Sequence, residues 1–275
     1  MSNNTKELKL AVLIDADNVP YSNIKGMMEE ITKYGTPTTK RIYADWTKPN
    51  ANGWKSVLLE HAITPIQQYS YTTGKNSSDS ALIIDAMDLL YSDKVDGFCI
   101  VSSDSDFTRL AIRLRESGMK VIGIGEKKTP NAFIVACDRF VFIEVLEGAT
   151  KKKKPKATTT TTPSDTKKVV EKETAIKIDN PTIDLIEDAI DAISDDDGWA
   201  FLGDVGNLIV KNKPEFDPRS YGFSKLTPML KSLTDILEID ERDSDKKGIK
   251  AHVKNMGRSL KFEKKKKKKG FFNIL

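Results

Sequence analysis

The sequence predicts an α/β fold, a mostly parallel sheet with helices on both faces, followed by a small α+β domain. Apolar strand-like segments and amphipathic helix-like segments alternate about five times between residues 8 and 146. This alternation is typical of parallel strands joined by right-handed helical crossovers. Residues 179–255 follow a different pattern, in which short amphipathic helices precede two strands. A chain of 275 residues is long enough for two such domains.

The strands of the first domain are indicated by short apolar runs. Residues 8–14 are apolar except for Lys9, which suits a central strand covered on both faces. Residues 97–102 form a second run of this kind. The remaining expected strands are residues 38–46, 64–69, 119–125 and 140–145. Parallel sheets bind ligands beyond the carboxyl ends of the strands, where the strand order reverses, so the residues that follow each strand are the candidates for a site.

Helices are expected between these strands, because capping residues precede the periodic segments and glycines follow them. Ser22 or Asn23 can cap the first helix, and Gly35 lies just beyond its end. Asp85 and Asp88 are expected on the solvated part of the third helix, and for Asp85 the alternative is a position near the acidic residues that follow the strands. The expected helices span residues 22–34, 52–62, 77–92, 104–117 and 130–138.

Residues 179–255 have the pattern of a winged helix, with three helices and a hairpin. The first helix is indicated by Ile183, Ile186 and Ile190, which share one helical face. A third helix is expected at residues 225–233, and the segments ILEIDE and IKAHVK are expected to form the two-stranded wing. The aromatic residues are expected in the core rather than as base-stacking groups: Trp199, Phe201, Tyr221 and Phe223.

Charge divides the chain into four blocks. Residues 1–148 carry a net charge of −2, and residues 179–255 carry −7, which does not suit ordinary duplex-DNA binding. The Thr- and Lys-rich segment 149–178 carries +6 and is expected to be a disordered linker. The tail, residues 256–275, carries +7 and contains six consecutive lysines. It is expected to be either a solubilising tail or a basic arm that binds phosphate backbones non-specifically.

The composition argues against several kinds of protein. No apolar run reaches the ~18 residues of a membrane-spanning helix, and the N-terminus lacks a signal-peptide core. Cys99 and Cys137 lie in apolar segments, so we expect core residues of a cytoplasmic protein rather than a disulfide. Two histidines are too few for the usual Cys/His zinc sites. The sequence DADNVP after the first strand is not the G-x-G-x-x-G of a dinucleotide site.

Acidic residues follow the two most apolar strands. Asp15 comes directly after the first strand, and Asp104 and Asp106 follow the strand at residues 97–102. Asp79 lies at the start of the third helix. Neighbouring strands end about 5 Å apart, so we expect the four carboxylates to converge if these two strands are neighbours. Such a cluster repels itself unless a cation neutralises it, and oxygen-only ligands favour Mg²⁺ or Mn²⁺.

The chemistry expected of such a cluster is hydrolysis of phosphodiester bonds. A divalent ion orients a water molecule, lowers its pKa and neutralises the charge that builds on the phosphate. Asn18 is expected to orient the water or a phosphate oxygen, and Lys75 is expected to offset phosphate charge. A second interpretation is open for each acid taken singly, because Asp is also a preferred helix-capping residue.

Three segments together resemble the NYN domain family, whose members are relatives of PIN-type ribonucleases. They are LIDADN, GKNSSDSALIIDAMDLL and FCIVSSDSDFTRLAIRLRESGMKVIGIG, all within residues 8–146. The resemblance implies a compact PIN-like, Rossmann-like α/β fold that binds Mg²⁺ or Mn²⁺ for RNA cleavage. It implies metal-binding, catalytic or substrate-binding roles for five residues of this chain: Asp15, Asn18, Asp79, Asp104 and Asp106.

The stretch YGFSKLTPMLKSL in residues 179–255 resembles the LOTUS domain, also called OST-HTH. This second resemblance implies binding to RNA or to a partner protein. Together the two resemblances predict a metal-dependent ribonuclease, acting on single-stranded RNA and directed by its C-terminal domain. Two alternatives lack catalysis: a silent RNA-binding regulator and a scaffold that recruits proteins. The segment DADNV also fits the opening motif of haloacid-dehalogenase-type phosphatases, in which Asp15 would be the nucleophile.

Overall fold

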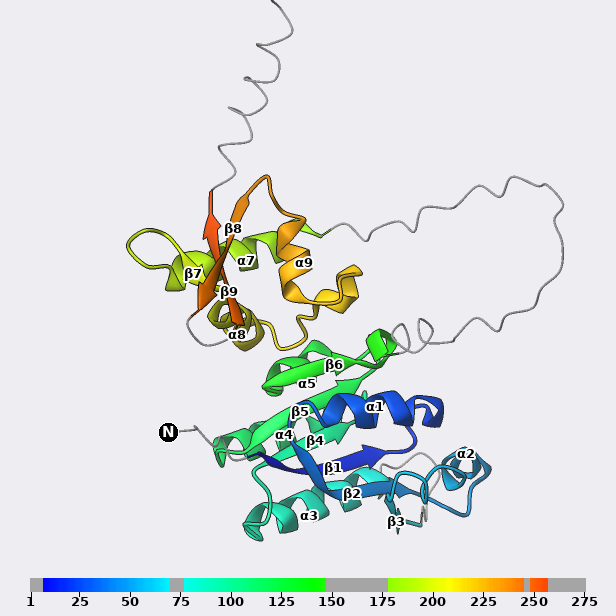
Figure 1. Cartoon of the computed structure of the whole chain (residues 1–275). Coiled ribbons are helices and arrows are strands. Elements are labelled where there is room, and N and C mark those ends of the chain that lie inside the picture. The colour runs from blue at the N-terminus through cyan, green and yellow to red at the C-terminus, as the bar shows by residue number, and fades with distance from the viewer. Residues whose placement is uncertain (1–6, 70–76, 147–177, 245–247, 257–275) are drawn as a thin grey trace, which may run out of the picture. The chain divides into compact units, whose positions relative to one another are not determined.

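The chain divides into two compact units, Met1–Thr159 and Thr160–Leu275 (Figure 1). Nearly all of the basic segment 149–178 and of the tail 256–275 lies outside the described residues, so their expected roles stay predictions. The computed structural model describes residues 7–69, 77–146, 178–244 and 248–256. Among these residues, no helix combines the length and the apolar character that crossing a membrane requires.

The first unit is built on a six-stranded sheet in which every strand is parallel to its neighbours. Its strands are β1 (Lys9–Asp15), β2 (Thr36–Ala44), β3 (Thr64–Gln67), β4 (Gly97–Val101), β5 (Lys120–Gly125) and β6 (Arg139–Phe142). The order is β3-β2-β1-β4-β5-β6, so the chain adds strands first on one side of β1 and then on the other. The reversal therefore lies between β1 and β4, the position at which sheets of this kind bind ligands.

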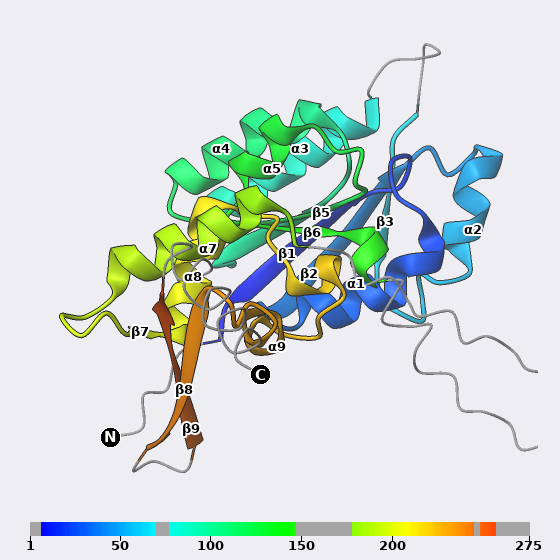
Figure 2. The same ribbon diagram turned by 90° about the horizontal axis from the view of Figure 1, so that it is seen from above.

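Helices cover both faces of this sheet, which confirms the predicted fold class (Figure 2). They are α1 (Ile24–Ile31), α2 (Asn52–Lys55), α3 (Ser77–Tyr91), α4 (Thr108–Glu116) and α5 (Asn131–Ala136). Successive residues of β1 point to opposite faces, so Leu13 packs in the core with α3, α4 and α5, whereas Ile14 packs with α1 and α2. Both cores need apolar side chains, which explains the continuous apolar run that predicts this strand.

The helix expected at residues 52–62 is regular only over Asn52–Lys55. The chain then continues through hydrogen-bonded turns, and Ala62 has a positive φ of 49° just before β3. Trp54 and Leu58 are nevertheless both buried. The apolar i, i+4 spacing therefore identifies the residues that reach the core, although the backbone between them is not a regular helix.

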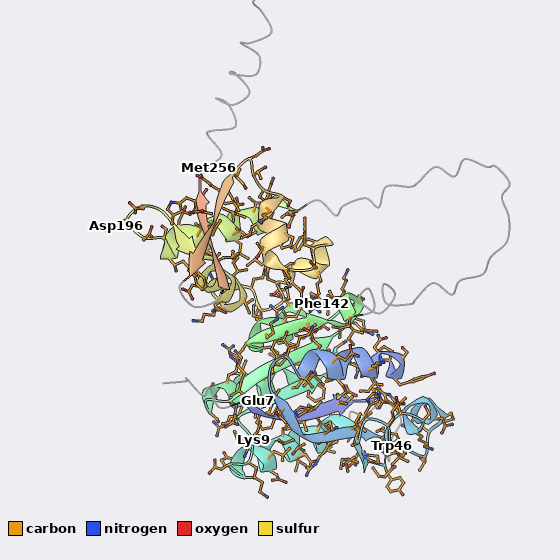
Figure 3. All side chains as sticks on the ribbon, in the orientation of Figure 1. Glu7, Lys9, Trp46, Phe142, Asp196 and Met256 are labelled. Atoms are coloured by element: carbon orange, nitrogen blue, oxygen red, sulfur yellow. The ribbon has the colours of Figure 1, made fainter. Side chains whose placement is uncertain are left out.

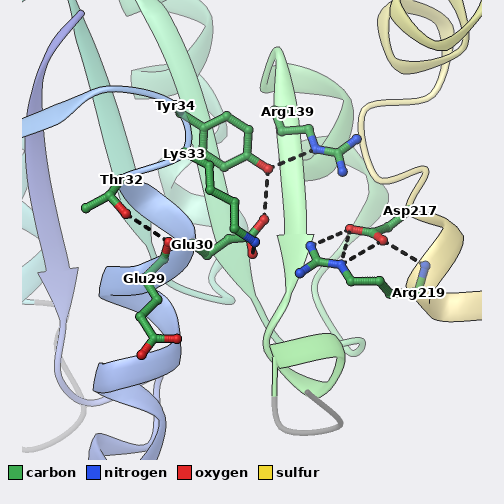
Figure 4. Close-up of polar contacts among 8 residues, drawn as sticks. All are labelled: Glu29, Glu30, Thr32, Lys33, Tyr34, Arg139, Asp217 and Arg219. Carbon is green, nitrogen blue, oxygen red and sulfur yellow. Dashed lines mark hydrogen bonds and ion pairs between the residues drawn. The ribbon is translucent and has the colours of Figure 1, made fainter. Parts of the chain in front are cut away.

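A buried polar network attaches the C-terminal end of α1 to β6 (Figure 4). Glu30 is 3% exposed, and its carboxylate accepts hydrogen bonds from Lys33 Nζ and the Tyr34 hydroxyl. The Nε of Arg139 in β6 donates to the same hydroxyl oxygen at 3.3 Å. These contacts satisfy a carboxylate that would otherwise be costly to bury.

The second unit packs three helices against a small antiparallel sheet. Its elements are α7 (Asn180–Ile193), β7 (Ala200–Phe201), α8 (Leu202–Asn212), α9 (Leu226–Lys231), β8 (Leu237–Ser244) and β9 (Gly248–Asn255). The sheet order is β7-β9-β8, and the β8–β9 hairpin is the expected wing. Ile186, Val205 and Met229, one from each helix, are fully buried with Val253 of β9. The unit therefore has its own hydrophobic core.

Polar contacts hold the turn that precedes α9. Asp217 caps the 3-10 helix Pro218–Tyr221 by accepting from the Arg219 backbone N–H at 2.9 Å. Its carboxylate also pairs with the Arg219 guanidinium, with an Nη2–Oδ2 distance of 2.6 Å (Figure 4). Tyr221 and Phe223 pack against the core as expected, whereas Phe201 is 40% exposed.

The two cysteines behave as the sequence predicts for core residues. Cys99 of β4 is fully buried between strands, and Cys137, just after α5, is 1% exposed. Both are free thiols. Burial raises the pKa of Cys137 to about 12, which keeps it protonated and unreactive.

Candidate metal centre

The carboxyl ends of β1 and β4 lie side by side where the strand order reverses (Figure 1). The two strands pair in parallel, with Ile14 of β1 opposite Val101 of β4. Asp15, the last residue of β1, is therefore level with Ser102, the first residue after β4. Asp15 is 1% exposed and Ser102 is fully buried, so solvent does not reach this point of the edge.

Three of the four predicted acids converge beside this point. Asp79, Asp104 and Asp106 each offer a carboxylate oxygen, and these oxygens all lie within 4.8 Å of one another. Asp79 belongs to the first turn of α3, and the other two belong to the loop and 3-10 helix that follow β4. Asp79 is buried and Asp106 is exposed, so one side of the cluster is open to solvent. Oxygen ligands in such a group suit a hard divalent cation.

Asp104 also caps the 3-10 helix Ser105–Phe107. Its Oδ1 accepts a hydrogen bond from the backbone N–H of Asp106 at 2.9 Å. The capping interpretation is therefore correct for this residue, and it is compatible with metal binding because a carboxylate has further lone pairs. The cap also restrains the carboxylate that contributes to the cluster.

Asp15 lies beside the cluster but is not one of the three converging acids. Its Oδ2 accepts hydrogen bonds from Asn18 Nδ2 at 2.7 Å and from Ser102 Oγ at 2.8 Å. Its Oδ1 accepts one from the backbone N–H of Asp17 at 3.2 Å. Burial raises the pKa of Asp15, and these hydrogen bonds offset part of the increase. Asn18, for which the sequence predicts a contact with water or phosphate, thus holds Asp15 in this structure.

The electrostatics of the site are clearest at Asp79. Burial raises the pKa of Asp79 to about 6. Neighbouring carboxylates add to the increase, in the order Asp15, Asp104, Asp106 and Asp17. Burial is the largest cause of this increase, and the rest reflects an excess of negative charge near Asp79. A divalent cation bound by these carboxylates would remove that excess, so the residues present fit a metal.

Ser102 belongs to this site although the sequence analysis does not single it out. Its Oγ donates to Asp15 and accepts from the backbone N–H of Asp104 at 3.1 Å. The available signal is its place directly after a buried apolar strand, because a polar side chain there must find buried partners. Lys75 lies outside the described residues, so its expected contact with phosphate stays a prediction.

Solved structures resemble parts of the chain. A protein of unknown function from Vibrio parahaemolyticus RIMD 2210633 is 22% identical, over 51% of this chain and 95% of that one, with a TM-score of 0.43. An uncharacterised protein from Nitrosomonas europaea is 28% identical, over 36% of this chain and 93% of that one, with a TM-score of 0.29. A fragment of a Chromobacterium violaceum protein is 34% identical, over 30% of this chain and 87% of that one, with a TM-score of 0.24.

No curated protein matches the chain. Family models match both units, in the order that the sequence predicts. The model of the NYN domain matches residues 9–144, and the model of the OST-HTH/LOTUS domain matches residues 177–249. Residues 9–144 therefore belong to the NYN domain family, and residues 177–249 belong to the OST-HTH/LOTUS domain family.

Proposed function

We propose that the protein is a metal-dependent ribonuclease whose NYN domain hydrolyses RNA and whose LOTUS domain binds RNA or a protein partner. One observation supports this proposal above all others: the carboxylates of Asp79, Asp104 and Asp106 converge in a domain of nuclease ancestry. The convergence joins the start of α3 to the end of β4, which are far apart along the chain. Negative charge concentrated in this way favours a bound cation.

Within this proposal Asp79, Asp104 and Asp106 hold Mg²⁺ or Mn²⁺. The ion supplies a water of lowered pKa and neutralises charge on the phosphate. Asp104 is kept in place by its own helix cap. Asp15 adds negative charge next to these three residues, because it lies close enough to raise the pKa of Asp79. Its carboxylate is held in place by Asn18 and Ser102.

The geometry does not favour a phosphatase in which Asp15 is the nucleophile. A nucleophilic carboxylate must present a free oxygen to the substrate. Asp15 is 1% exposed, and both of its oxygens accept hydrogen bonds. We therefore assign Asp15 a role in holding the metal site.

Two further parts of the proposal rest on other residues. Lys75, four positions before Asp79, offsets the charge of a bound phosphate. The lysine-rich segments 149–178 and 256–275 strengthen binding to RNA backbones and make it depend on salt. The free buried thiols of Cys99 and Cys137 agree with a reducing, cytoplasmic location.

The test is cleavage of single-stranded RNA by the full chain with Mg²⁺ or Mn²⁺. We expect Asp104→Asn to lower the rate by about 100-fold or more, because a lost ligand weakens the metal and misplaces its water. Asp88→Asn is the matched control, since Asp88 is an exposed acid of α3 outside the cluster. Equal cleavage by the wild type and Asp104→Asn would remove the assignment. RNA that is bound tightly but never cut would instead support a silent binding protein.

A further inference from the structure

We propose that Tyr21 and Tyr69 form a base-stacking subsite for unpaired RNA on the β2–β3 side of the acidic cluster. This inference rests on the proposed ribonuclease function and adds to it two residues that would contact the bases of the substrate. It assigns a role to two half-exposed aromatic side chains of the NYN domain, which are 48% and 55% exposed. Tyr43 and Trp54 of the same domain are almost completely buried, whereas Tyr91, at the far end of α3, is 70% exposed.

Both tyrosines lie at the edge of the sheet that carries the acids. Tyr21 is three residues beyond Asn18, whose amide binds Asp15. The Cα atoms of Asn18 and Tyr21 are therefore at most about 10 Å apart. Tyr69 follows β3, and the preceding residue, Gln68, donates from its backbone N–H to Ala44 at the end of β2. β3, which Tyr69 follows, is two strands from β1, a spacing of about 10 Å across the sheet.

One side of the Tyr21 ring packs against α2. A Cβ placed on Gly53 of α2 would lie 2.4 Å from Cε1 of Tyr21, so the ring rests against the bare backbone of that glycine. Trp54, the next residue, donates from Nε1 to the carbonyl of Ala16 at 3.3 Å and fixes α2 beside the end of β1. A ring that is supported on one side and half exposed is suited to receive a base without a large ordering cost.

The segment between β2 and β3 offers cations for the phosphates that accompany such bases. Lys55 at the end of α2 is exposed, and Lys48 lies in the loop after β2, where its Nζ pairs with Asp45 Oδ2 at 3.8 Å. Trp46, which is labelled in Figure 3, anchors this loop, because its Nε1 donates to the carbonyl of Ile66 in β3 at 2.9 Å. A stacking surface beside lysines on a fixed loop has the features by which proteins bind single strands.

The subsite selects unpaired RNA for a simple physical reason. The faces of bases inside a duplex are covered by their neighbours, and only splayed or single-stranded bases can stack on a side chain. Stacking on tyrosine tolerates every base, because each base has a π-face. The subsite therefore favours single strands over duplexes and selects little between sequences.

The test measures how far binding depends on bases. The full chain is titrated in EDTA, which prevents cleavage, against a labelled oligouridylate and against an abasic oligonucleotide of equal length and charge. The ratio of the two affinities isolates the contribution of the bases, because lysines bind both backbones alike. We expect Tyr21→Leu and Tyr69→Leu each to reduce this ratio by about 5-fold to 100-fold. Tyr21→Phe, which keeps the ring, should retain the ratio of the wild type.

Tyr91→Leu is the matched control, because Tyr91 is 70% exposed but lies at the far end of α3 from Asp79. A ratio unchanged in both leucine variants would overturn the subsite, as would equal loss of affinity for both oligonucleotides. A wild type that binds the two oligonucleotides equally would also overturn the subsite, and it would favour a contact with another protein as the role of the two tyrosines. Cleavage with Mn²⁺ is recorded separately. If the wild type cleaves RNA and the leucine variants keep its affinity ratio, only the subsite is rejected. If the leucine variants have a reduced ratio and the wild type does not cleave RNA, the subsite is supported and the nuclease is rejected.

Discussion

The side-chain hydroxyl of Ser102 binds the carboxylate of Asp15 at the centre of the sheet edge. The Oγ of Ser102 donates to Asp15 Oδ2 at 2.8 Å, and it accepts from the backbone N–H of Asp104 at 3.1 Å. The ends of β1 and β4 are paired through their backbones, and this buried side chain adds a link between Asp15 and the backbone of Asp104.

Replacing this serine tests whether the link matters for metal binding. We expect Ser102→Ala to lower the affinity for Mn²⁺ by about 10-fold to 100-fold, because an unsupported Asp15 and Asp104 no longer hold their orientation. The free energy of unfolding should fall by about 1–3 kcal/mol, since a buried carboxylate loses a donor. Calorimetric titration with Mn²⁺ and urea denaturation measure the two effects.

Ser103→Ala is the matched control for this variant. Ser103 is also buried, but its Oγ accepts from the backbone N–H of Glu126 and does not contact Asp15. It should lower stability without a comparable loss of Mn²⁺ affinity. An equal loss of Mn²⁺ affinity in both variants would show that Ser102 acts only through general stability.

Asp79 makes the stability of the metal-free protein depend on pH. Its pKa is raised from 3.8 to about 6 by folding, so the folded state binds more protons than the unfolded state between these values. The free energy of unfolding therefore falls as the pH rises through this interval. Asp79→Asn removes the penalty, and in EDTA we expect it to stabilise the protein above pH 6 by on the order of 1 kcal/mol.

Thermal unfolding of both proteins in EDTA measures this effect. Near pH 3.8, where Asp79 of the wild type is protonated when folded, the gain from Asp79→Asn should vanish. With saturating Mn²⁺ above pH 6 the order should reverse, because the ion stabilises only a protein that binds it. A variant no more stable than the wild type in EDTA at any pH contradicts the raised pKa of Asp79.

Asp85 has a structural role that its expected position does not predict. Its side chain is 25% exposed, and its Oδ2 accepts from Arg41 Nη1 at 2.9 Å and from the Tyr43 hydroxyl at 2.8 Å. We expect Asp85→Asn to lower the free energy of unfolding by about 1–2 kcal/mol, since charge-assisted hydrogen bonds become neutral ones. Mn²⁺ affinity should not change. Asp88→Asn on the same helix should alter stability by no more than about 0.5 kcal/mol, and a similar loss in both variants would contradict the assigned role.

Gly53 offers an independent way to displace the ring of Tyr21. The Cβ of Gly53→Ala would meet that ring at 2.4 Å, and the exposed ring can move away at little cost to stability. We expect the base-dependent affinity ratio to fall while the unfolding temperature changes little. Gly26→Ala is the control, because its Cβ meets only Leu146 at an ordinary 3.5 Å. An unchanged ratio in Gly53→Ala would mean that the position of the ring does not matter.

The strands and the acidic cluster could be predicted because both follow from local patterns and one topological rule. Continuous apolar runs identify β1 and β4, and parallel neighbours bring their carboxyl ends together. The sequence therefore places Asp104 and Asp106 correctly at the edge where Asp79 also lies. The sequence could not predict that Asp15 stays outside the group formed by Asp79, Asp104 and Asp106, because this depends on which hydrogen-bond donors surround each carboxylate.

The features that sequence reasoning missed depend on partners that are distant along the chain. Ser102 binds an acid 87 residues away, and Asp85 pairs with Arg41, 44 residues away. Such pairs are set by register and by helix rotation, which periodicity alone does not fix. The strand β7 (Ala200–Phe201) was missed for another reason, because two residues are too few to show an alternating pattern.

The central claim is that the carboxylates of Asp79, Asp104 and Asp106 bind one divalent ion. Crystals of the full chain grown with Mn²⁺ and measured at the manganese absorption edge test it directly. We expect an anomalous peak between these three side chains in the wild type and its loss in Asp104→Asn. Ordered crystals of the wild type with no anomalous density at the cluster, at a Mn²⁺ concentration that supports RNA cleavage, would contradict it.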